Sequence, residues 1–265
     1  MVSFRNYAEE IQRLTRLRTF PLAIKMLRSE ADIPEGSMRP RKDLKHCIAA
    51  CQGFVMSRTS GSSVAMLKED MWCYLPVIAY GMAPATAEFL DGRNRYPLGE
   101  NATLEAAAHW ASEQFPRFEN GKYVGVASAP LAAANFTPDL VMIYSNTLQL
   151  ILFLHAIGYR DGNDLSTKLS RSAACVYSVV CPLRENKCWV SIPCLGDRRR
   201  AMAADDEIIL SIPASQMDDF MTGLRKCGKQ LPYEPSLMPE YPLPPEYSKM
   251  ARMLGMTRAD GGEIK

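Results

Sequence analysis

The sequence predicts a single α/β or α+β domain, in which a mixed, largely antiparallel sheet carries packed helices. Three observations lead to this fold class. Strand-like and helix-like segments alternate along most of the chain, the second half repeats the order strand, strand, helix, and the composition changes to Pro-rich after residue 230. Consecutive strands without a helix between them do not fit an all-parallel sheet, because parallel neighbours need a crossover connection.

The first half of the chain is predicted to open with an amphipathic helix at residues 4–17, where apolar residues recur at helical spacing. A short strand follows at residues 21–27. A second helix is expected at residues 41–56, because apolar side chains form one stripe and Gly53 lies near the end. This stripe consists of Leu44, Cys47, Ile48, Cys51 and Val55.

The middle of the chain continues with a strand and two helices. The strand VAML, residues 64–67, follows the turn signal RTSGSS. Residues 68–82 carry two acidic residues, Glu69 and Asp70, near their start, which favours a helix N-terminus and places Cys73 in the first turns of that helix. Residues 101–115 start with an Asn and are rich in alanine, which predicts a packing helix.

The second half contains an internal repeat of element order. Residues 123–158 are predicted to form strand, turn, strand and helix, and residues 188–228 show the same order. In both copies an aspartate, Asp139 or Asp206, precedes the second strand. The pattern predicts two ββα units that share one sheet.

Two regions are expected from composition. Residues 1–230 form the single domain, and residues 231–265 form a Pro-rich C-terminal extension packed on the body, because its prolines do not suit helix or sheet interiors. We expect a short helix within the extension near residues 246–254.

Charge and hydropathy limit the class of protein. The chain has 31 Lys and Arg against 29 Asp and Glu, a net charge of +2, which gives little support for nucleic-acid binding. The first residues lack the apolar run of a signal peptide, and the longest apolar stretch, residues 148–159, is too short to span a bilayer. We therefore expect a cytoplasmic protein without a nucleic-acid or membrane partner.

The cysteines are the main candidates for chemistry, because nucleotide-binding, zinc-protease and serine-hydrolase motifs are absent and the chain has only three histidines. Cys47 and Cys51 are spaced by one helical turn, Cys73 begins another helix, and Cys194 ends a strand. Thiolates from separate segments suit an iron–sulfur cluster, and a structural zinc remains open. Cys175 and Cys181 are alternative ligands. The competing interpretation is that these thiols only fill the core.

A second candidate site is the segment GDRRR. After the strand that ends at Cys194, the residues Gly196, Asp197 and Arg198 are predicted to form a turn that binds a phosphate or carboxylate through backbone amides and the guanidinium group. The alternative is an ordinary solvated hairpin turn.

Several segments, in their order, resemble a family known as domain of unknown function 169, which is common in anaerobic archaea and bacteria. They are PLAIKML, HCIAACQG, EDMWCYLPVIAYG, GVASAPL with PDLVMIYSN, SIPCLGDRR, DDEIILSIP and MTGLRK, which together span about residues 5–235. The resemblance carries no activity. It implicates Cys51, Cys73 and Cys194, together with the glycine and arginine of GDR, and an anaerobic habitat suits oxygen-sensitive clusters.

The leading functional hypothesis is a cytoplasmic iron–sulfur or other thiolate-ligated metal protein of anaerobic metabolism, in redox or cofactor handling. Its ligands would be Cys47, Cys51, Cys73 and Cys194 around a cluster such as 4Fe–4S. Partners would be a small-molecule ligand or a redox protein, and a homo-oligomer is left open. The alternative is a metal-free protein that binds a small anionic ligand. Catalysis by one activated thiol is a third hypothesis, for which the sequence offers little in the way of a base.

Overall fold

The computed structural model describes residues 4–228 and 245–256. The chain divides into two compact units, Met1–Gln230 and Leu231–Lys265. The second unit contains helix α11, Pro245–Met253, in the range where a short helix is predicted. The Pro-rich residues 231–244, which we expect to pack on the body, lie outside the described residues.

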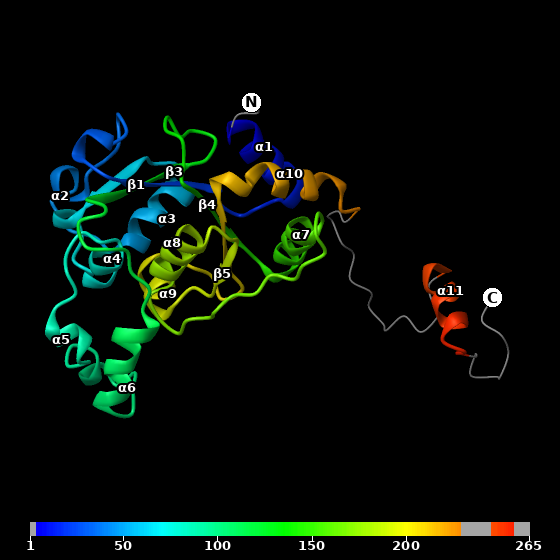
Figure 1. Cartoon of the computed structure of the whole chain (residues 1–265). Helices are drawn as coiled ribbons and strands as arrows, with labels where there is room; N and C mark the ends of the chain where they lie inside the picture. The colour runs from blue at the N-terminus through cyan, green and yellow to red at the C-terminus, as the bar shows by residue number, and fades with distance from the viewer. Residues whose placement is uncertain (1–3, 229–244, 257–265) are drawn as a thin grey trace. The chain divides into compact units, whose positions relative to one another are not determined.

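The first unit is built on one six-stranded sheet with the order β2-β3-β1-β4-β6-β5 (Figure 1). Each neighbouring pair of strands is antiparallel. This arrangement confirms the predicted fold class as α+β. The strands are β1 Leu22–Leu27, β2 Val64–Leu67, β3 Gly125–Pro130, β4 Leu140–Ser145, β5 Trp189–Ser191 and β6 Ile208–Pro213.

Helices cover both faces of this sheet, which explains why its strands are almost entirely buried and mostly apolar instead of alternating. All residues of β4 are buried, and they divide between two cores. Leu140, Met142 and Tyr144 pack in one core, whereas Val141 and Ile143 pack in the other. The period of two along the strand therefore sends successive side chains to opposite layers.

The core that contains Val141 is closed by α1 Phe4–Thr15, α7 Thr147–Gly158 and α10 Met217–Lys226. Helices α7 and α10 pack directly against each other. Their contact requires glycine at position 223, because a Cβ atom there would lie 2.1 Å from the carbonyl oxygen of Ala156.

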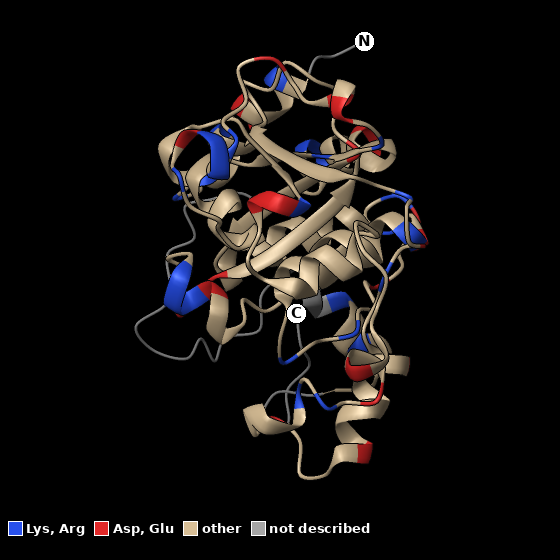
Figure 2. Cartoon of the chain, turned by 90° about the vertical axis from the view of Figure 1, so that its left-hand side faces the viewer, with Lys and Arg blue, Asp and Glu red and all other residues tan. Residues whose placement is uncertain are grey.

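The core that contains Leu140 is closed by α3 Ala50–Ser60 and α8 Ala174–Glu185, which contact several strands. Figures 1 and 2 show α5 and α6 in a lobe that projects away from the sheet. The remaining α-helices of the first unit are α2 Pro40–Asp43, α4 Tyr74–Ala79, α5 Ala87–Leu90, α6 Leu104–His109 and α9 Leu195–Arg200.

The sequence-based expectation for the segment between β1 and β2 is corrected. The helix predicted at residues 41–56 is wrong, because α2 ends at Asp43 and α3 begins only at Ala50. Between them Lys45 has a φ of 61°, and the Ile48 N–H donates to the carbonyl oxygen of Asp70 at 2.8 Å. The chain is thus drawn into an extended contact with residues 70–72 in place of a helix, which an apolar stripe does not reveal.

The two predicted ββα units do share one sheet, but they are not equivalent: β3 and β4 are followed by α7, whereas helix α9 lies between β5 and β6 where a turn was expected. Strands β5 and β6 are direct neighbours, whereas β1 lies between β3 and β4. Acidic and basic residues are distributed over many elements (Figure 2). No helix among residues 4–228 and 245–256 is long and apolar enough to cross a membrane.

Candidate functional site

A cavity of about 540 Å³ lies among the first residues of four helices on the α3 and α8 side of the sheet. Cys51, Cys73, Cys175 and Cys194 all line it. We call it the thiol cavity. The four cysteines come from segments spread over more than half of the chain, so the fold itself brings them to one place.

Each of these cysteines sits at a helix start. Cys51 and Cys175 are the second residues of α3 and α8, and Cys73 and Cys194 immediately precede α4 and α9. Helix N-termini carry partial positive charge and free backbone N–H groups, which favour anions such as thiolates. Four such termini around one cavity make it a favourable place for negative charge.

Burial nevertheless keeps the thiols protonated. It is the main cause that raises the pKa of Cys51, Cys73, Cys175 and Cys194. Backbone N–H groups oppose this effect at Cys73 and at Cys194 by stabilising the thiolate. Without a cation in the cavity, the thiols therefore retain their protons at neutral pH.

Asp197 is a buried acidic residue of the cavity lining and is only 1% exposed. Its Oδ2 atom accepts hydrogen bonds from the Cys194 Sγ at 2.8 Å and from the Cys194 backbone N–H at 3.2 Å. Its Oδ1 atom is buried and has no hydrogen-bond partner among the described residues. Burial raises the pKa of this carboxyl group. A buried acceptor without a protein partner is a group that a water molecule, a donor or a cation can satisfy.

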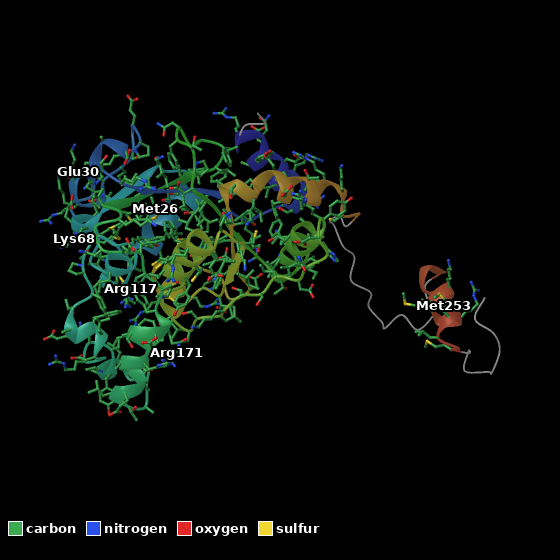
Figure 3. All side chains as sticks on the ribbon, in the orientation of Figure 1. Met26, Glu30, Lys68, Arg117, Arg171 and Met253 are labelled. Atoms are coloured by element: carbon green, nitrogen blue, oxygen red, sulfur yellow. The ribbon has the colours of Figure 1, made fainter. Side chains whose placement is uncertain are left out.

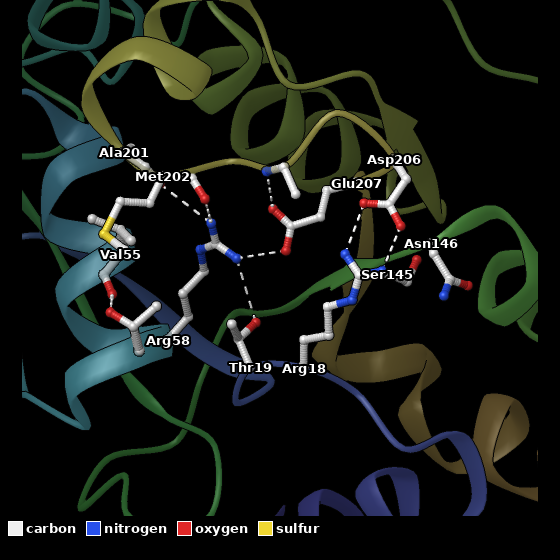
Figure 4. A network of polar contacts seen from close by, with 12 residues as sticks. Arg18, Thr19, Val55, Arg58, Ser145, Asn146, Ala201, Met202, Asp206 and Glu207 are labelled. Carbon is white, nitrogen blue, oxygen red and sulfur yellow. Dashed lines mark hydrogen bonds and ion pairs between the residues drawn. The ribbon is translucent and has the colours of Figure 1, made fainter.

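A buried ion pair fixes the far end of α9, the helix that follows Cys194 and contains Asp197 (Figure 4). The Arg58 Nη1 atom donates to Glu207 Oε1 at 2.8 Å. Its Nη2 atom donates to the carbonyl oxygens of Ala201 and Met202, the two residues after α9, at 3.2 and 3.0 Å. Because Arg58 belongs to α3, this contact fastens α9 to the helix that carries Cys51.

The structure brings together three of the four predicted ligands, Cys51, Cys73 and Cys194. Cys47 does not line the thiol cavity, and its Sγ donates to the carbonyl oxygen of Glu69 at 3.2 Å. Cys47 and Cys51 do not share a helical face, because Cys47 precedes the first residue of α3. Cys175, predicted only as an alternative, lines the cavity instead, while Cys181 does not.

The GDRRR segment is helix α9 and not a turn, which corrects the expectation. Gly196 and Asp197 line the thiol cavity, whereas the Arg198 guanidinium is directed elsewhere and donates to the carbonyl oxygen of Ala204 at 2.6 Å. The three residues therefore do not form one binding turn. The physical reason is that Cys194 and Asp197 cap this helix reciprocally, so the chain coils directly after residue 194.

Sequence reasoning missed the basic and aromatic part of the cavity, which includes Trp72, Arg95 and Arg171. Nothing in their local sequence marks them, because they belong to three separate loops. Within residues 4–228 and 245–256, no group of three or more His, Cys, Asp or Glu side chains is placed to hold a metal ion. The thiols share a cavity without meeting at one point.

Fold and cavity thus define an α+β protein with a thiol-lined site. The chain belongs to the domain of unknown function 169 family, described as "Uncharacterised ArCR", whose model matches residues 10–223. This finding confirms the resemblance. The chain is similar to "Uncharacterized protein MJ0308" of Methanocaldococcus jannaschii, with 23% identity over 221 residues, 83% of this chain and 93% of that protein. No solved structure matches.

Proposed function

We propose that this protein binds a metal or an iron–sulfur cluster through thiolates of the thiol cavity, with Cys51, Cys73, Cys194 and Cys175 as ligands. One observation carries the proposal: four thiols from four separate helix starts line the same 540 Å³ cavity. The resemblance to a family of anaerobic organisms supports a role in redox or cofactor handling.

The donor set fits such a group chemically. Four thiolates are the usual ligands of iron–sulfur clusters and also suit tetrahedral zinc. The helix N-termini offset part of the negative charge that four thiolates bring. Since Fe–S and Zn–S bonds are about 2.3 Å long, loading requires the cysteine side chains to turn toward a common centre. A bound cluster would supply one-electron transfer or a Lewis-acidic iron.

The residues of the chain would manage protons during loading. Each thiol must lose its proton before it binds a metal, so affinity rises with pH. Asp197 Oδ2 already accepts a hydrogen bond from Cys194 Sγ and is the nearest described acceptor for that proton.

Anaerobic purification followed by iron, sulfide and zinc analysis tests the proposal. We expect bound metal in the wild type and its loss in Cys51→Ser and Cys194→Ser. The matched control is Cys188→Ser, because Cys188 is also buried, at 4% exposure, but lies in the opposite core and donates to Gln216. A metal-free, colourless wild type would end the proposal, as would equal metal loss in the Cys188 variant.

The second candidate function is that of a metal-free protein that binds a small anionic ligand. It is favoured by the basic side chains that line the cavity, Arg95, Arg171, Arg199 and Arg200. In that function the cysteines only pack. Cys51→Ser would then lower stability without changing ligand affinity, whereas loss of a guanidinium group would weaken binding. The metal proposal predicts the opposite: the cysteine variants lose the bound group, whereas the arginine variants keep it.

A further inference from the structure

The mouth of the thiol cavity exposes large apolar side chains. Trp72 is 49% exposed and Leu195 is 82% exposed, and Tyr74 and Leu98 line the same opening. Apolar residues scattered singly over a surface need no explanation, but a group of them around one cavity marks a binding surface. The cavity therefore offers an apolar wall to whatever enters it.

The same opening is positively charged. Arg171, Arg199 and Arg200 have no carboxylate partner in the part of the chain that the structure describes. Among the described residues Arg171 donates to the neutral side chain of Asn101, and it lies beside helix α6 (Figure 3). The Arg200 guanidinium lies 5.2 Å from the centre of the Trp72 ring. Charge and aromatic surface are thus already adjacent.

Arg95 extends this positive charge into the interior. Its side chain is 2% exposed and its guanidinium stacks on Trp110 at 3.8 Å. It pairs with Glu100 and donates to Ser172 Oγ at 3.1 Å, but its Nε atom is buried without a hydrogen-bond partner among the described residues. An unpartnered buried donor is a group that an acceptor on a bound ligand can satisfy.

We propose that the mouth of the thiol cavity binds an organic anion, whose carboxylate or phosphate group is held by Arg171 and Arg200 and whose aromatic body lies against Trp72. Guanidinium groups hold either anion through paired hydrogen bonds, and an aromatic ring stacks on the exposed indole. This inference deepens the proposed function by giving the class of ligand, and it rests on the same cavity but not on a bound metal.

Three probes separate the parts of this proposal: 2-naphthoate, 2-naphthyl phosphate and the uncharged 2-naphthalenemethanol. Binding to the full chain, measured by calorimetry, should be at least about tenfold tighter for the charged probes than for the alcohol. The charged probe that binds more tightly shows whether the site prefers a carboxylate or a phosphate. Equal affinity for the alcohol and both charged probes would overturn the proposal.

Two variants locate the anion. Arg171→Met and Arg200→Met should each weaken the preferred charged probe at least about fivefold and leave the alcohol unchanged. Both residues are exposed, so the fold should tolerate their replacement, which a urea midpoint verifies. The matched control is Arg160→Met, because Arg160 is exposed and pairs with Asp219 outside this cavity. Unchanged affinity in both cavity variants would refute the assignment.

The outcome is separable from that of the metal proposal. The titrations are made on chelator-treated protein and repeated on protein purified anaerobically. Charge-dependent binding of the naphthyl probes to a protein that never holds metal would refute the metal proposal alone. A metal-loaded protein that does not prefer the charged probes in either preparation would refute the organic-anion site alone.

Discussion

Replacing Arg58 with methionine should destabilise the protein strongly, because Arg58 belongs to a buried ion pair. The Arg58 and Glu207 side chains are 2% and 6% exposed. The guanidinium also stacks on Tyr144 at 4.1 Å and donates to the carbonyl oxygens of Ala201 and Met202. Methionine preserves most of the apolar stem but removes every one of these polar contacts.

The size of the stability loss follows from the charge that remains buried on Glu207. Removal of one member of a buried pair costs about 3–5 kcal/mol, chiefly because the other charge is left uncompensated. Glu207 keeps one hydrogen bond, from the Ala204 N–H at 2.9 Å, which does not neutralise it. We therefore expect the Arg58→Met variant to lose about 4 kcal/mol of unfolding free energy, a large part of the total for an ordinary domain.

Urea unfolding of the metal-free protein at pH 7 measures this loss. Arg18→Met is the matched control, because Arg18 binds Asp206 through two hydrogen bonds of 2.8 and 2.6 Å close to the buried pair (Figure 4). The side chains of Arg18 and Asp206 are about half exposed, at 56% and 47%. Solvent screens such a pair, so the Arg18→Met midpoint should stay near that of the wild type.

The double variant Arg58→Met/Glu207→Met provides the sharpest test. With both charges removed, no unpaired carboxylate remains, so it should be more stable than Arg58→Met alone. If the double variant lost the sum of the two single losses, or if Arg18→Met cost as much as Arg58→Met, the reasoning from burial would be wrong.

Three further predictions concern thiols and packing. Iodoacetamide at pH 7.5 should modify Cys47 and Cys227 before the four cysteines of the thiol cavity, because burial raises the pKa values of the latter; mass spectrometry reads the order. The metal-free protein should lose stability as pH rises above about 8.5, since unfolded thiols ionise there while folded ones keep their protons; urea midpoints at pH 8 and 9.5 measure this. Gly223→Ala should cost about 1–3 kcal/mol through its clash with Ala156, again by urea unfolding.

Each of these has a contradicting outcome. Faster labelling of any cavity thiol than of Cys47 would show a low-pKa thiolate that burial does not allow. The sign of the pH effect is fixed, because a group whose pKa is higher in the folded state disfavours folding once the unfolded group ionises. Burial also raises the pKa of Cys188 to about 12, which adds in the same direction. An unfolding free energy that increased up to pH 9.5 would contradict the raised pKa values of the cavity cysteines and of Cys188. An unchanged urea midpoint of Gly223→Ala would contradict the close contact between α7 and α10.

The fold class was accessible from sequence because apolar periodicity directly records burial. Strands such as β4 form a nearly continuous apolar run, and amphipathic helices such as α1 show a single apolar stripe. The helix expected at residues 41–56 failed for a physical reason that periodicity does not contain. Tertiary hydrogen bonds of Ile48 with residues 70 and 72 replace the helical ones in that segment.

The candidate site was only partly accessible. Cys73 and Cys194 were recognisable because each stands beside a local helix or turn signal. Cys175 resembles any buried cysteine of an apolar helix, and Arg95 lies in an ordinary polar loop. Their shared position depends on the strand order, which places β1 between β3 and β4 and sets which helix starts become neighbours. No local pattern encodes that order.

Two buried polar atoms of the thiol cavity lack a partner that a bound ligand would supply. Asp197 Oδ1 and Arg95 Nε are both buried without a partner among the described residues, and both residues line the same cavity. A buried unpaired donor or acceptor costs about 1–3 kcal/mol, and apolar side chains in their places would avoid that cost. A cation near Asp197 would satisfy its Oδ1 atom and an acceptor near Arg95 would satisfy its Nε atom, so both atoms are compatible with the proposed metal and with a ligand that carries acceptor groups.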